Sequence, residues 1–570
     1  MTTTPRTAEQ QGDSVTQEQD RRHSGGDVLV RVMKRHGIDV AFGVISIHNL
    51  PLVEAISREL RFVEMRHEAA CVNAADGYAR ATGKVGVAIT STGTGAGNAA
   101  GSMVEALTAG SRVLHVTGQV ESHWVGSNQG VIHEVPHQLE MLRAVSKHAA
   151  PITAADEAEA VLEGAIAQIL TAPQGPASVE WPTDLQYLAR TDAQHPWRPV
   201  QQRPIELPED SLAAAAALIE GARRPLFWVG GGAAGAGAEL TELLHRTGAG
   251  LFSSNSGRAI VSEDHAQVIG NFAATERGAS LLADADLLIS VGTHFRSNET
   301  RTYHLRLPVQ HLGINLDPRA LERPYSASHK LVGDARQLLA ALAERMRHGS
   351  TDPGWTDRVR QVREQVRTEL FDHIGGYAEI CRELRGQLPR EAVVARDVTI
   401  PSSQWGNRLL EFYDRESNIF PLGGGIGQGL AMGIGAAVGR PEVPTIVIAG
   451  DGGLAVHLGE LASLAGSGAR CVVVVFNDSG YGVLRNMQHA HGFDRAGVDL
   501  FTPDFETLAA SIRLPFWRTG APGTFGPALE RALTVNGPAM IEVTVGDLDP
   551  APGAFTPPVH IPTPNESRGE

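Results

Sequence analysis

The feature that most constrains the fold of this chain is the repeated alternation of short apolar segments with longer, helix-like stretches. Segments such as 445–450 (TIVIAG) and 471–476 (CVVVVF) are almost entirely apolar, without alternation between polar and apolar residues. Strands of this kind are buried on both faces, as in parallel sheets covered by helices. The same pattern predicts strands at 62–66, 85–90, 113–118, 176–181, 225–230, 250–254, 287–292, 311–317, 393–397 and 539–545. The expected fold is α/β, with three doubly wound parallel-sheet domains.

Two breaks in composition divide the 570 residues, one rich in Pro and Gln near 190–208 and one near 347–356. Both have the composition of linkers. The predicted domains are an N-terminal domain at 26–190, a central Rossmann-like domain at 205–346 and a C-terminal domain at 357–550, all of ordinary size. The polar residues 1–25 are expected to be disordered. The Pro-rich tail, 551–570, is irregular, and the sequence leaves open whether it is disordered or covers a cleft.

The composition limits the classes of partner and the cellular compartment that we expect for this protein. The formal net charge is −15, so the surface repels nucleic acids and anionic membranes. No stretch approaches the ~18 consecutive apolar residues of a membrane span, and the N-terminus lacks the apolar core of a secretory signal. The three cysteines are far apart and odd in number, which argues against a disulfide scaffold. We therefore expect a cytoplasmic protein whose partners are neither nucleic acids nor anionic membranes.

The strongest functional pattern consists of two turns that follow neighbouring predicted strands. Gly450-Asp451-Gly452-Gly453 ends the strand at 445–450, and the turn NDSGYG at 477–482 follows the strand at 471–476. Between them, leucines recur at the spacing of one helix, at Leu454, Leu458, Leu461 and Leu464. The right-handed crossover of such a βαβ unit places the two strand ends side by side. Ligands of open α/β sheets bind at that edge.

This unit brings together two carboxylates, Asp451 and Asp478, which are 27 positions apart (478 − 451). Backbone N–H groups at a glycine-rich helix start bind anions, and Mg²⁺ held by the carboxylates can accept phosphate oxygens as further ligands. The expected metal ligands are Asp451, Asp478 and a main-chain carbonyl near Gly480. The alternative is two ordinary βα turns, where Asp and Gly serve as caps.

The two turns together resemble the cofactor motif of thiamine-diphosphate enzymes, a Gly-Asp-Gly followed by an Asn-rich turn and an aromatic-Gly pair. From about residue 26 to 548 the chain is similar to the acetolactate synthase, benzoylformate decarboxylase and benzaldehyde lyase branch of that superfamily. The resemblance implies thiamine diphosphate and Mg²⁺, with Gly450, Gly452, Gly453 and Tyr481 beside the cofactor. One departure is Asp478, where the family usually has Asn, which adds a negative charge beside the diphosphate.

A second stretch resembles the part of the family that activates the cofactor, namely Arg66-His67-Glu68 followed by DGYARATG at 76–83. The resemblance assigns Glu68 to a hydrogen bond with N1′ of the aminopyrimidine, which needs a carboxyl group kept protonatable by partial burial. The alternative is a solvated glutamate at a helix start. The glycine run 422–429 matches another family element, in which Ile426 supports the bent cofactor and the carbonyl of Gly424 accepts from its amino group. Ser402 and Ser403 are candidate phosphate contacts.

Two histidines are candidate proton carriers, because imidazole exchanges protons near neutral pH. His48 falls where benzaldehyde lyase has a histidine, and His133 falls where similar synthases have Gln. The alternative for His48 is a loop histidine bonded to backbone, whereas His115, on a predicted strand, is expected to be core. Val483 and Met487 match positions that shape the pocket for the acyl substituent.

A rival interpretation rests on the run 230–235 (GGGAAG), which fits the G-x-G-x-x-G dinucleotide fingerprint, and on Gly95, Gly97 and Ala100, which fit a looser form. These predict an FAD- or NAD-dependent oxidoreductase. However, no acidic residue ends the strand at 250–254, where the ribose contact belongs. Tightly bound FAD is therefore the less favoured expectation.

The resemblance implies a decarboxylase or carboligase, a lyase or transferase that acts on a 2-oxo acid through a C2 ylide and an enamine, as acetolactate synthase does. A hydroxyketone lyase of the benzaldehyde lyase type is the alternative within the family. Because Glu68 and the metal turns fall in different domains, which come from different subunits in this family, the resemblance also implies a homodimer or homotetramer with active sites at the subunit interface.

Overall fold

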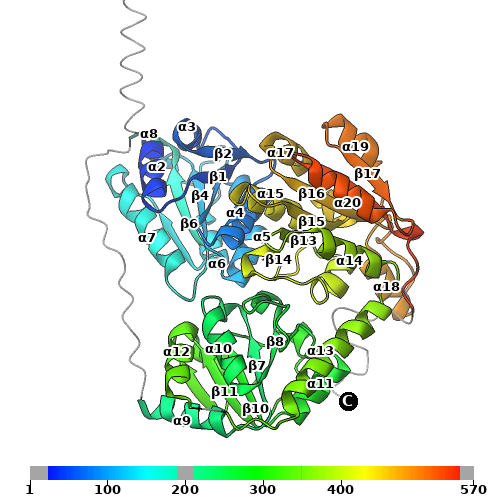
Figure 1. The fold of residues 1–570 in the computed structure, drawn as a ribbon. Coiled ribbons are helices and arrows are strands. Elements are labelled where there is room, and N and C mark those ends of the chain that lie inside the picture. The colour runs from blue at the N-terminus through cyan, green and yellow to red at the C-terminus, as the bar shows by residue number, and fades with distance from the viewer. Residues whose placement is uncertain (1–23, 189–208, 348, 553–570) are drawn as a thin grey trace, which may run out of the picture. The chain divides into compact units, whose positions relative to one another are not determined.

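The computed structural model describes residues 24–188, 209–347 and 349–552, and its strands form three six-stranded parallel sheets flanked by helices (Figure 1). The predicted α/β fold of three parallel sheets is thereby confirmed. Most of the residues predicted to form the two tails and the first linker, 1–23, 189–208 and 553–570, lie outside the described residues. The chain divides into two compact units, which are described separately.

The first unit consists of the described part of 1–202 together with 431–440 and 457–469. Its sheet has the strand order β2-β1-β3-β4-β6-β5. β2 lies on one side of β1, and β3 lies on its other side. The ends of β1 and β3 therefore make a topological switch point. The strands are β1 (Val40–Gly43), β2 (Arg61–Glu64), β3 (Gly86–Thr90), β4 (Val113–Gln119), β5 (His148–Pro151) and β6 (Ala177–Pro182).

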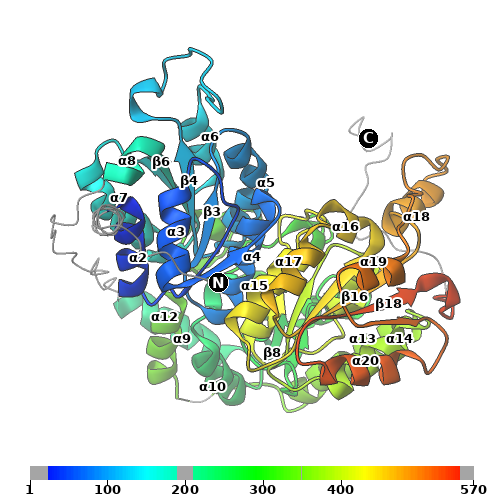
Figure 2. The ribbon, with the colours of Figure 1, turned by 90° about the horizontal axis from the view of Figure 1, so that it is seen from above.

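Helices cover both faces of this first sheet (Figures 1 and 2). One face carries α2 (Gly25–Arg35), α3 (Leu50–Glu59) and α7 (Ala158–Leu170), whose apolar side chains form one core with the sheet. The other face carries α4 (Glu68–Thr82), α5 (Thr94–Ala109) and α6 (Gln138–Val145). The short helix α8 (Thr183–Leu188) follows β6 directly. Between β4 and α6 the chain forms a long loop that reaches out from the sheet edge, light blue in Figure 2.

The second unit contains the middle and third sheets. The middle sheet has the order β9-β8-β7-β10-β11-β12, which is that of dinucleotide-binding folds. Its strands are β7 (Pro225–Val229), β8 (Gly250–Ser253), β9 (Val268–Gly270), β10 (Leu287–Val291), β11 (Gln310–Asn315) and β12 (His329–Val332). Its helices are α9 (Glu209–Gly221), α10 (Gly237–Thr247), α11 (Glu276–Asp284), α12 (Ala335–Arg345) and α13 (Trp355–Asp372).

The third sheet, β14-β13-β15-β16-β18-β17, repeats the strand order of the first. Its strands are β13 (Val393–Arg396), β14 (Asn418–Ile419), β15 (Thr445–Gly450), β16 (Cys471–Asn477), β17 (Phe516–Thr519) and β18 (Ala539–Thr544). Its helices are α14 (Tyr377–Gln387), α16 (Asp451–Val456), α18 (Gly482–Ala490), α19 (Phe505–Ser511) and α20 (Phe525–Thr534). Trp228 of the middle sheet and Trp405 beside the third belong to one continuous apolar core, which also contains Trp355 of α13.

The predicted βαβ unit is present, because β15 and β16 are parallel neighbours in the sheet. The leucine spacing at 454–464 was expected to mark one helix, and that expectation is wrong. The segment forms two helices, α16 and α17 (Glu460–Ser467), with Gly459 as the cap between them. Glycine weakens a helix interior, and Leu458 at the break is only half-buried whereas the other three leucines are buried.

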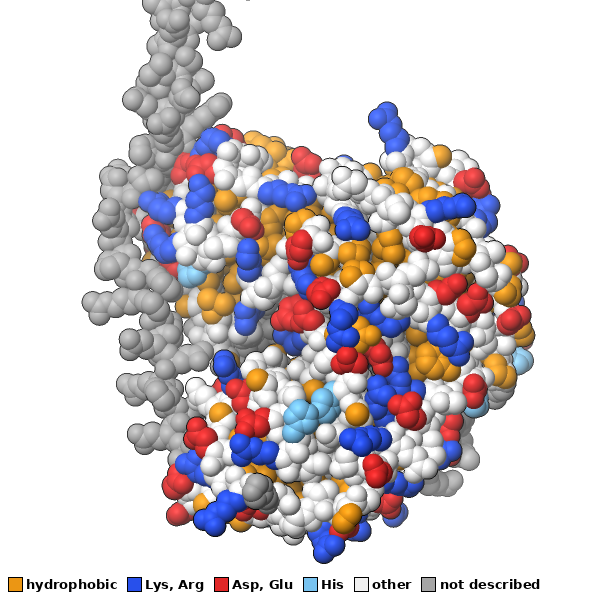
Figure 3. Space-filling model, viewed as in Figure 1, with side chains coloured by type: hydrophobic (Ala, Val, Ile, Leu, Met, Phe, Trp, Pro, Cys, Tyr) orange, Lys and Arg blue, Asp and Glu red, His pale blue; other side chains and the backbone are white. Residues whose placement is uncertain are grey.

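The surface in Figure 3 mixes acidic and basic side chains, and neither sign forms a broad continuous area on the face shown. Such a face lacks the basic stripe that phosphate backbones require. None of the helices in the described ranges is long and apolar enough to cross a membrane.

Candidate active site

Glu68 is the first residue of α4, at the edge of the first sheet just beyond β2. The helix begins there because His67 serves as its N-cap, accepting the Ala69 N–H with Nδ1 at 3.2 Å. Asn98 of α5 donates to Glu68 Oε2 at 3.0 Å. A Cβ on Gly95 would lie 2.9 Å from Glu68 Oε1, so this glycine makes room for the carboxylate. Gly95, first considered part of a dinucleotide fingerprint, therefore has a steric role beside Glu68.

A second carboxylate, that of Glu460, fixes the backbone of the segment that precedes Glu68 in the chain. It is 1% exposed and accepts the Arg66 N–H with Oε1 at 3.0 Å and with Oε2 at 3.3 Å. Burial raises the pKa of Glu460 above its ordinary value, and the hydrogen bonds from the backbone N–H of Arg66 oppose that rise. Sequence reasoning missed this residue, because nothing in the local pattern of α17 links it to Glu68.

His48 lies in the loop that connects β1 to α3, and polar contacts fix that loop on the ends of β3 and β4. The buried Asn49 donates to Val44 O and to Thr90 O, and Gln186 donates to His48 O at 2.8 Å. A Cβ on Gly118 would lie 2.6 Å from His48 O, so the loop approaches β4 more closely than a side chain would permit. The position of His48 is thus set by tertiary contacts along its whole loop.

His133 lies in the long loop after β4, where its backbone adopts φ +68°. The adjacent Glu134 organises this loop, since its carboxylate accepts the four backbone N–H groups of residues 128–131. A Cβ on Gly93 would lie 2.5 Å from His133 O, so the loop also approaches the start of α5 closely. Positive φ is uncommon outside glycine, and it follows here from the tight turn that Glu134 closes.

The structure brings the two histidines together. The rings of His48 and His133 lie edge to face, with centroids 5.1 Å apart. Glu68 and His133 meet the start of α5 at Gly95 and Gly93, so all three predicted catalytic residues converge on the edge of the first sheet. Burial, and then the neighbouring His133, lower the pKa of His48 below its ordinary value, while Glu121 opposes this. A lowered pKa favours a neutral imidazole at physiological pH.

His115 is a core residue, as the sequence predicts. It is fully buried on β4 between Thr90 Oγ1 at 2.8 Å and Ser178 Oγ at 3.2 Å. Burial lowers its pKa to about 4, so the ring is neutral at physiological pH.

The predicted pair of carboxylates is also present, in the second unit. Asp451 begins α16 at the end of β15, and Asp478 follows β16. The Asp478 N–H donates to Asp451 Oδ1 at 3.4 Å, and Thr502 donates to Asp451 Oδ2 at 3.0 Å. Burial, followed by the charge of Asp451, raises the pKa of Asp478 to about 6, and Arg485 opposes this. The contact with Thr502 was not predicted, because the residue is distant in sequence.

These two carboxylates fit a magnesium ion that is completed by phosphate oxygens. Among the described residues no cluster of three or more His, Cys, Asp or Glu side chains could hold a metal. A site of two carboxylates and a carbonyl therefore leaves ligand positions for a substrate or cofactor, which is how Mg²⁺ is often bound. Gly480 pairs with Asp499 in an isolated bridge, and its Cβ would lie 2.1 Å from Val498 O, so its backbone is fixed beside Asp478.

The glycine run at 422–429 is held by Asp397, whose carboxylate accepts the N–H groups of Gly427 at 3.0 Å and Gly429 at 3.1 Å. Burial raises the pKa of Asp397 to about 6, although its backbone hydrogen bonds oppose this. Gly424 and Gly427 adopt φ of +81° and +82°, which side chains disfavour. Ile426, between them, is 39% exposed on the turn. The role of Asp397 in the turn was not predicted.

The remaining predicted residues lie around the same two turns of the second unit. Gly452 lies against the ring of Tyr481, which a Cβ would approach to 2.7 Å, and Gly453 lies beside Asp397. Ser402 is fully buried, and its Oγ has no hydrogen-bond partner among the described residues, whereas the Ser403 N–H donates to Thr399 O. On α18, Met487 is buried and Val483 half-buried. An unpaired buried hydroxyl is costly, so Ser402 fits a polar ligand.

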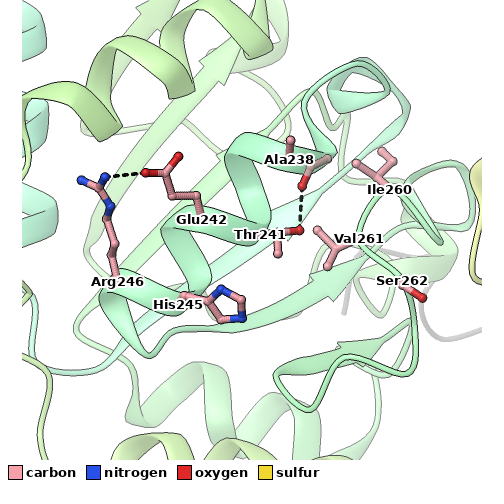
Figure 4. Close-up of a pocket in the computed structure, with 9 residues that line it drawn as sticks. Ala238, Thr241, Glu242, His245, Arg246, Ile260, Val261 and Ser262 are labelled. Atoms are coloured by element: carbon pink, nitrogen blue, oxygen red, sulfur yellow. Dashed lines mark hydrogen bonds and ion pairs between the residues drawn. The ribbon is translucent and has the colours of Figure 1, made fainter.

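Two glycines of the rival interpretation, Gly230 and Gly232 at the end of β7, are in contact with other backbone. Gly230 N and Gly232 N donate to Val291 O and Gly292 O, and a Cβ on Gly232 would lie 2.8 Å from Gly292 Cα. Close backbone packing therefore accounts for these glycines without a ligand. The middle sheet also bears a shallow hollow of about 650 Å³ over α10 and residues 260–262, where Glu242 and Arg246 form an ion pair (Figure 4). None of the residues predicted to be functional lines it.

Comparison with known proteins gives three matches to models of one family along the chain. Residues 23–145 match the thiamine pyrophosphate enzyme N-terminal TPP binding domain, 212–342 match the central domain, and 401–543 match the C-terminal TPP binding domain. A probable 2-ketoarginine decarboxylase of Pseudomonas aeruginosa is 30% identical over 492 residues, covering 85% of this chain and 87% of that protein. The acetolactate synthase isozyme 2 large subunit of Escherichia coli is 27% identical, covering 92% of this chain and 96% of that protein.

Proposed function

This chain belongs to the thiamine pyrophosphate enzymes, and from that premise we propose that it is a Mg²⁺-dependent decarboxylase or carboligase acting on a 2-oxo acid. Relatives named as a decarboxylase and as acetolactate synthases support this reaction class. The observation that carries the proposal is the convergence of Glu68, His48 and His133 on one sheet edge of a thiamine pyrophosphate enzyme.

The second unit supplies the groups for the diphosphate end of the cofactor. Asp451, Asp478 and the carbonyl of Gly480 would hold Mg²⁺, and the backbone at Gly452 and Gly453 would face phosphate oxygens. Ser402 would donate its free hydroxyl, and Ile426 would support the cofactor from the exposed glycine turn. Thiamine diphosphate, when bound, supplies a nucleophilic carbon and an electron sink for loss of CO₂.

The first unit supplies proton transfer. Glu68 accepts a hydrogen bond from Asn98 and would hold a proton on its carboxylate, facing the aminopyrimidine of the cofactor. His48 is suited to accept a proton because its lowered pKa leaves it neutral, and its buried Nε2 has no hydrogen-bond partner among the described residues. His133, which is exposed and packs edge to face against His48, would exchange that proton with the substrate or solvent.

The test is product analysis by NMR with thiamine diphosphate and Mg²⁺ present. The donor panel runs from pyruvate to 2-oxo acids with larger apolar, acidic and guanidino side chains, each with and without an added aldehyde. Release of aldehyde alone identifies a decarboxylase, and a coupled C–C product identifies a carboligase. Failure to turn over every donor, with no cofactor retained after desalting, would refute the assignment.

We also propose a homodimer or homotetramer in the cytoplasm, in which different subunits supply Glu68 and Asp451 to one active site. The resemblance to a family in which the two domains that carry these residues come from different subunits supports shared sites, and the three buried, unpaired cysteines fit a reducing compartment. Mixing inactive Glu68→Gln and Asp451→Ala chains under exchange conditions should restore part of the activity, because some hybrid sites contain both native residues. No recovery in hybrids verified by mass would refute shared sites.

A further inference from the structure

Thr183 connects His48 to the end of a neighbouring strand. It is the first residue after β6, and its Oγ1 lies 3.0 Å from His48 Nδ1. The same Oγ1 lies 2.9 Å from the backbone carbonyl oxygen of Gln119 at the end of β4. The three groups therefore form a chain, from carbonyl to hydroxyl to imidazole, along the edge of the first sheet.

The protons of this chain can be counted. A carbonyl oxygen only accepts, and a threonine hydroxyl has one proton to donate and lone pairs to accept with. Both contacts are satisfied only when the Thr183 hydroxyl donates to Gln119 O and His48 donates from Nδ1 to Thr183 Oγ1. If Nδ1 had no proton, the single hydroxyl proton would have to serve two acceptors.

We propose that Thr183 is a positioning residue that fixes His48 in the Nδ1–H tautomer and so leaves Nε2 as the base for proton transfer. The inference deepens the proposed function and rests on it for the role of His48. Nε2 is buried and has no hydrogen-bond partner among the described residues. Since a partner on one ring nitrogen decides which nitrogen is free, Nε2 is the nitrogen without a proton, and the exposed His133 that packs on the ring would carry protons between it and the substrate.

The surroundings of His48 favour a neutral ring. His133 packs edge to face on it, and a positive charge on either ring opposes a charge on the other. Glu121 is the acidic group that acts on His48 in the opposite sense. The backbone of His48 is fixed by Gln186 at its carbonyl and by Ser46 Oγ at its N–H, 3.2 Å away. Thr183 therefore contacts the imidazole of a residue whose main chain is already fixed by other hydrogen bonds.

The first test reads the tautomer directly by ¹⁵N NMR of histidine-labelled protein, with His48→Gln used to assign the resonance. It needs neither cofactor nor substrate. Wild type and Thr183→Ser, which keeps the hydroxyl, should show protonated Nδ1 and bare Nε2. Thr183→Val should shift His48 toward the Nε2–H tautomer. A protonated Nε2 in the wild type, or no change in Thr183→Val, would overturn the proposal.

The second test measures the pH profile of kcat/KM with the donor found by product analysis. Thr183→Val should lower kcat about 10-fold, a modest part of a general-base contribution, and move the acid limb of the profile. The KM for thiamine diphosphate should stay within about 2-fold of the wild-type value. Thr183→Ser should restore both the rate and the profile, which a purely structural role would not require.

Thr171→Val is the matched control, because Thr171 likewise donates its hydroxyl to a backbone carbonyl, that of Ala167, at 2.7 Å. It should leave the tautomer and the pH profile unchanged. An altered tautomer in Thr183→Val with an unaltered rate would overturn the proposal while leaving the decarboxylase or carboligase assignment intact. Absence of turnover in the wild type would instead refute the proposed function, and the NMR result would still decide the tautomer.

Discussion

The first and third sheets have the same strand order and carry different chemistry at the same edge. At the edge of the first sheet, Glu68 and two imidazoles are held by neutral hydrogen-bond donors and acceptors such as Asn98 and Thr183. At the edge of the third sheet, two carboxylates lie side by side. The strand order decides where a ligand can bind, and the residues that end the strands decide whether the site moves protons or holds a cation.

The middle sheet is instructive because it has the order of dinucleotide-binding folds and a matching glycine run. Gly230 and Gly232 of that run pack against Gly292 on the neighbouring strand end. The strand order and the glycine pattern therefore do not by themselves identify a binding site. In the first and third sheets, by contrast, ionisable side chains lie against one another at that edge, His48 with His133 and Asp451 with Asp478.

The largest expected effect separates the chemistry of the two edges. Glu68→Gln keeps the shape of the side chain but removes its ability to exchange a proton, so turnover should fall by about 10²–10⁴. Binding of thiamine diphosphate, followed by fluorescence quenching, should be retained because the carboxylates of the third sheet are untouched.

The control for this variant is Glu64→Gln, an exposed glutamate at the end of β2. It should keep full activity. If Glu68→Gln retained more than about a tenth of wild-type turnover, far above what the expected loss of at least about 10²-fold allows, the first sheet would not be the site of proton exchange.

Asp451→Ala should have the converse effect. If Asp451 is the proposed Mg²⁺ ligand, its loss should lower the affinity for the cofactor with Mg²⁺ on the order of 10²-fold. Isothermal calorimetry with thiamine diphosphate at fixed Mg²⁺ measures this. Asp357→Ala, an exposed aspartate on α13, is the control. Unchanged affinity in Asp451→Ala would assign the carboxylate pair a purely structural role.

A smaller effect is expected from Gly95→Ala. The added Cβ would lie 2.9 Å from Glu68 Oε1 and 2.8 Å from Ser91 Cβ, which forces the carboxylate to move. Turnover should fall about 10-fold, since small misplacements of a catalytic group are costly, whereas cofactor affinity should not change.

Gly101→Ala, on the same helix α5, is the matched control because a Cβ there would meet nothing within 4 Å. It should be active and slightly more stable, by roughly 0.5–1 kcal/mol, because alanine favours the helix. Equal losses in the two variants would mean that α5 tolerates no substitution, and the contact with Glu68 would not explain the result.

The smallest expected effect is a difference in how pH affects the stability of the two sheets. The folded pKa of His115 is about 4, below its ordinary 6.5, so the unfolded chain takes up the proton first and stability falls as pH drops through that window. Asp397 has a folded pKa of about 6, above its ordinary 3.8, so stability falls as pH rises through that window. Each term amounts to about 3 kcal/mol at most.

Thermal unfolding between those limits measures both terms. His115→Gln should make the acid side of the profile shallower, and Asp397→Asn should remove the opposing slope. Because the chain has more than one compact unit, the midpoints of separate transitions are the quantities to compare. If both variants changed the profile in the same direction, the two sheets would not differ in the way described.

The sequence predicted the twelve longer or more apolar strands and missed six, all of four residues or fewer. The missed strands are β1, β5, β9, β12, β14 and β17. Several lie at sheet edges or are partly exposed, such as β12 and β17. A strand with a solvent-facing side has no continuous apolar run, and a two-residue strand such as β14 has no pattern at all.

The sequence by itself determined the α/β fold, the carboxylate pair and the choice of Glu68 as a candidate catalytic residue, because strands, turns and motifs are local patterns. Only the tertiary structure decided that His48 and His133 touch, that Glu460 holds the backbone before Glu68 and that Asp397 holds the glycine turn. The contact between Thr183 and His48 is found only in the structure, where the end of β6 lies beside the loop of His48. Hydrogen bonds between residues far apart in the chain produce no recognisable spacing in the sequence, because the ends of parallel strands come together only when the sheet has formed.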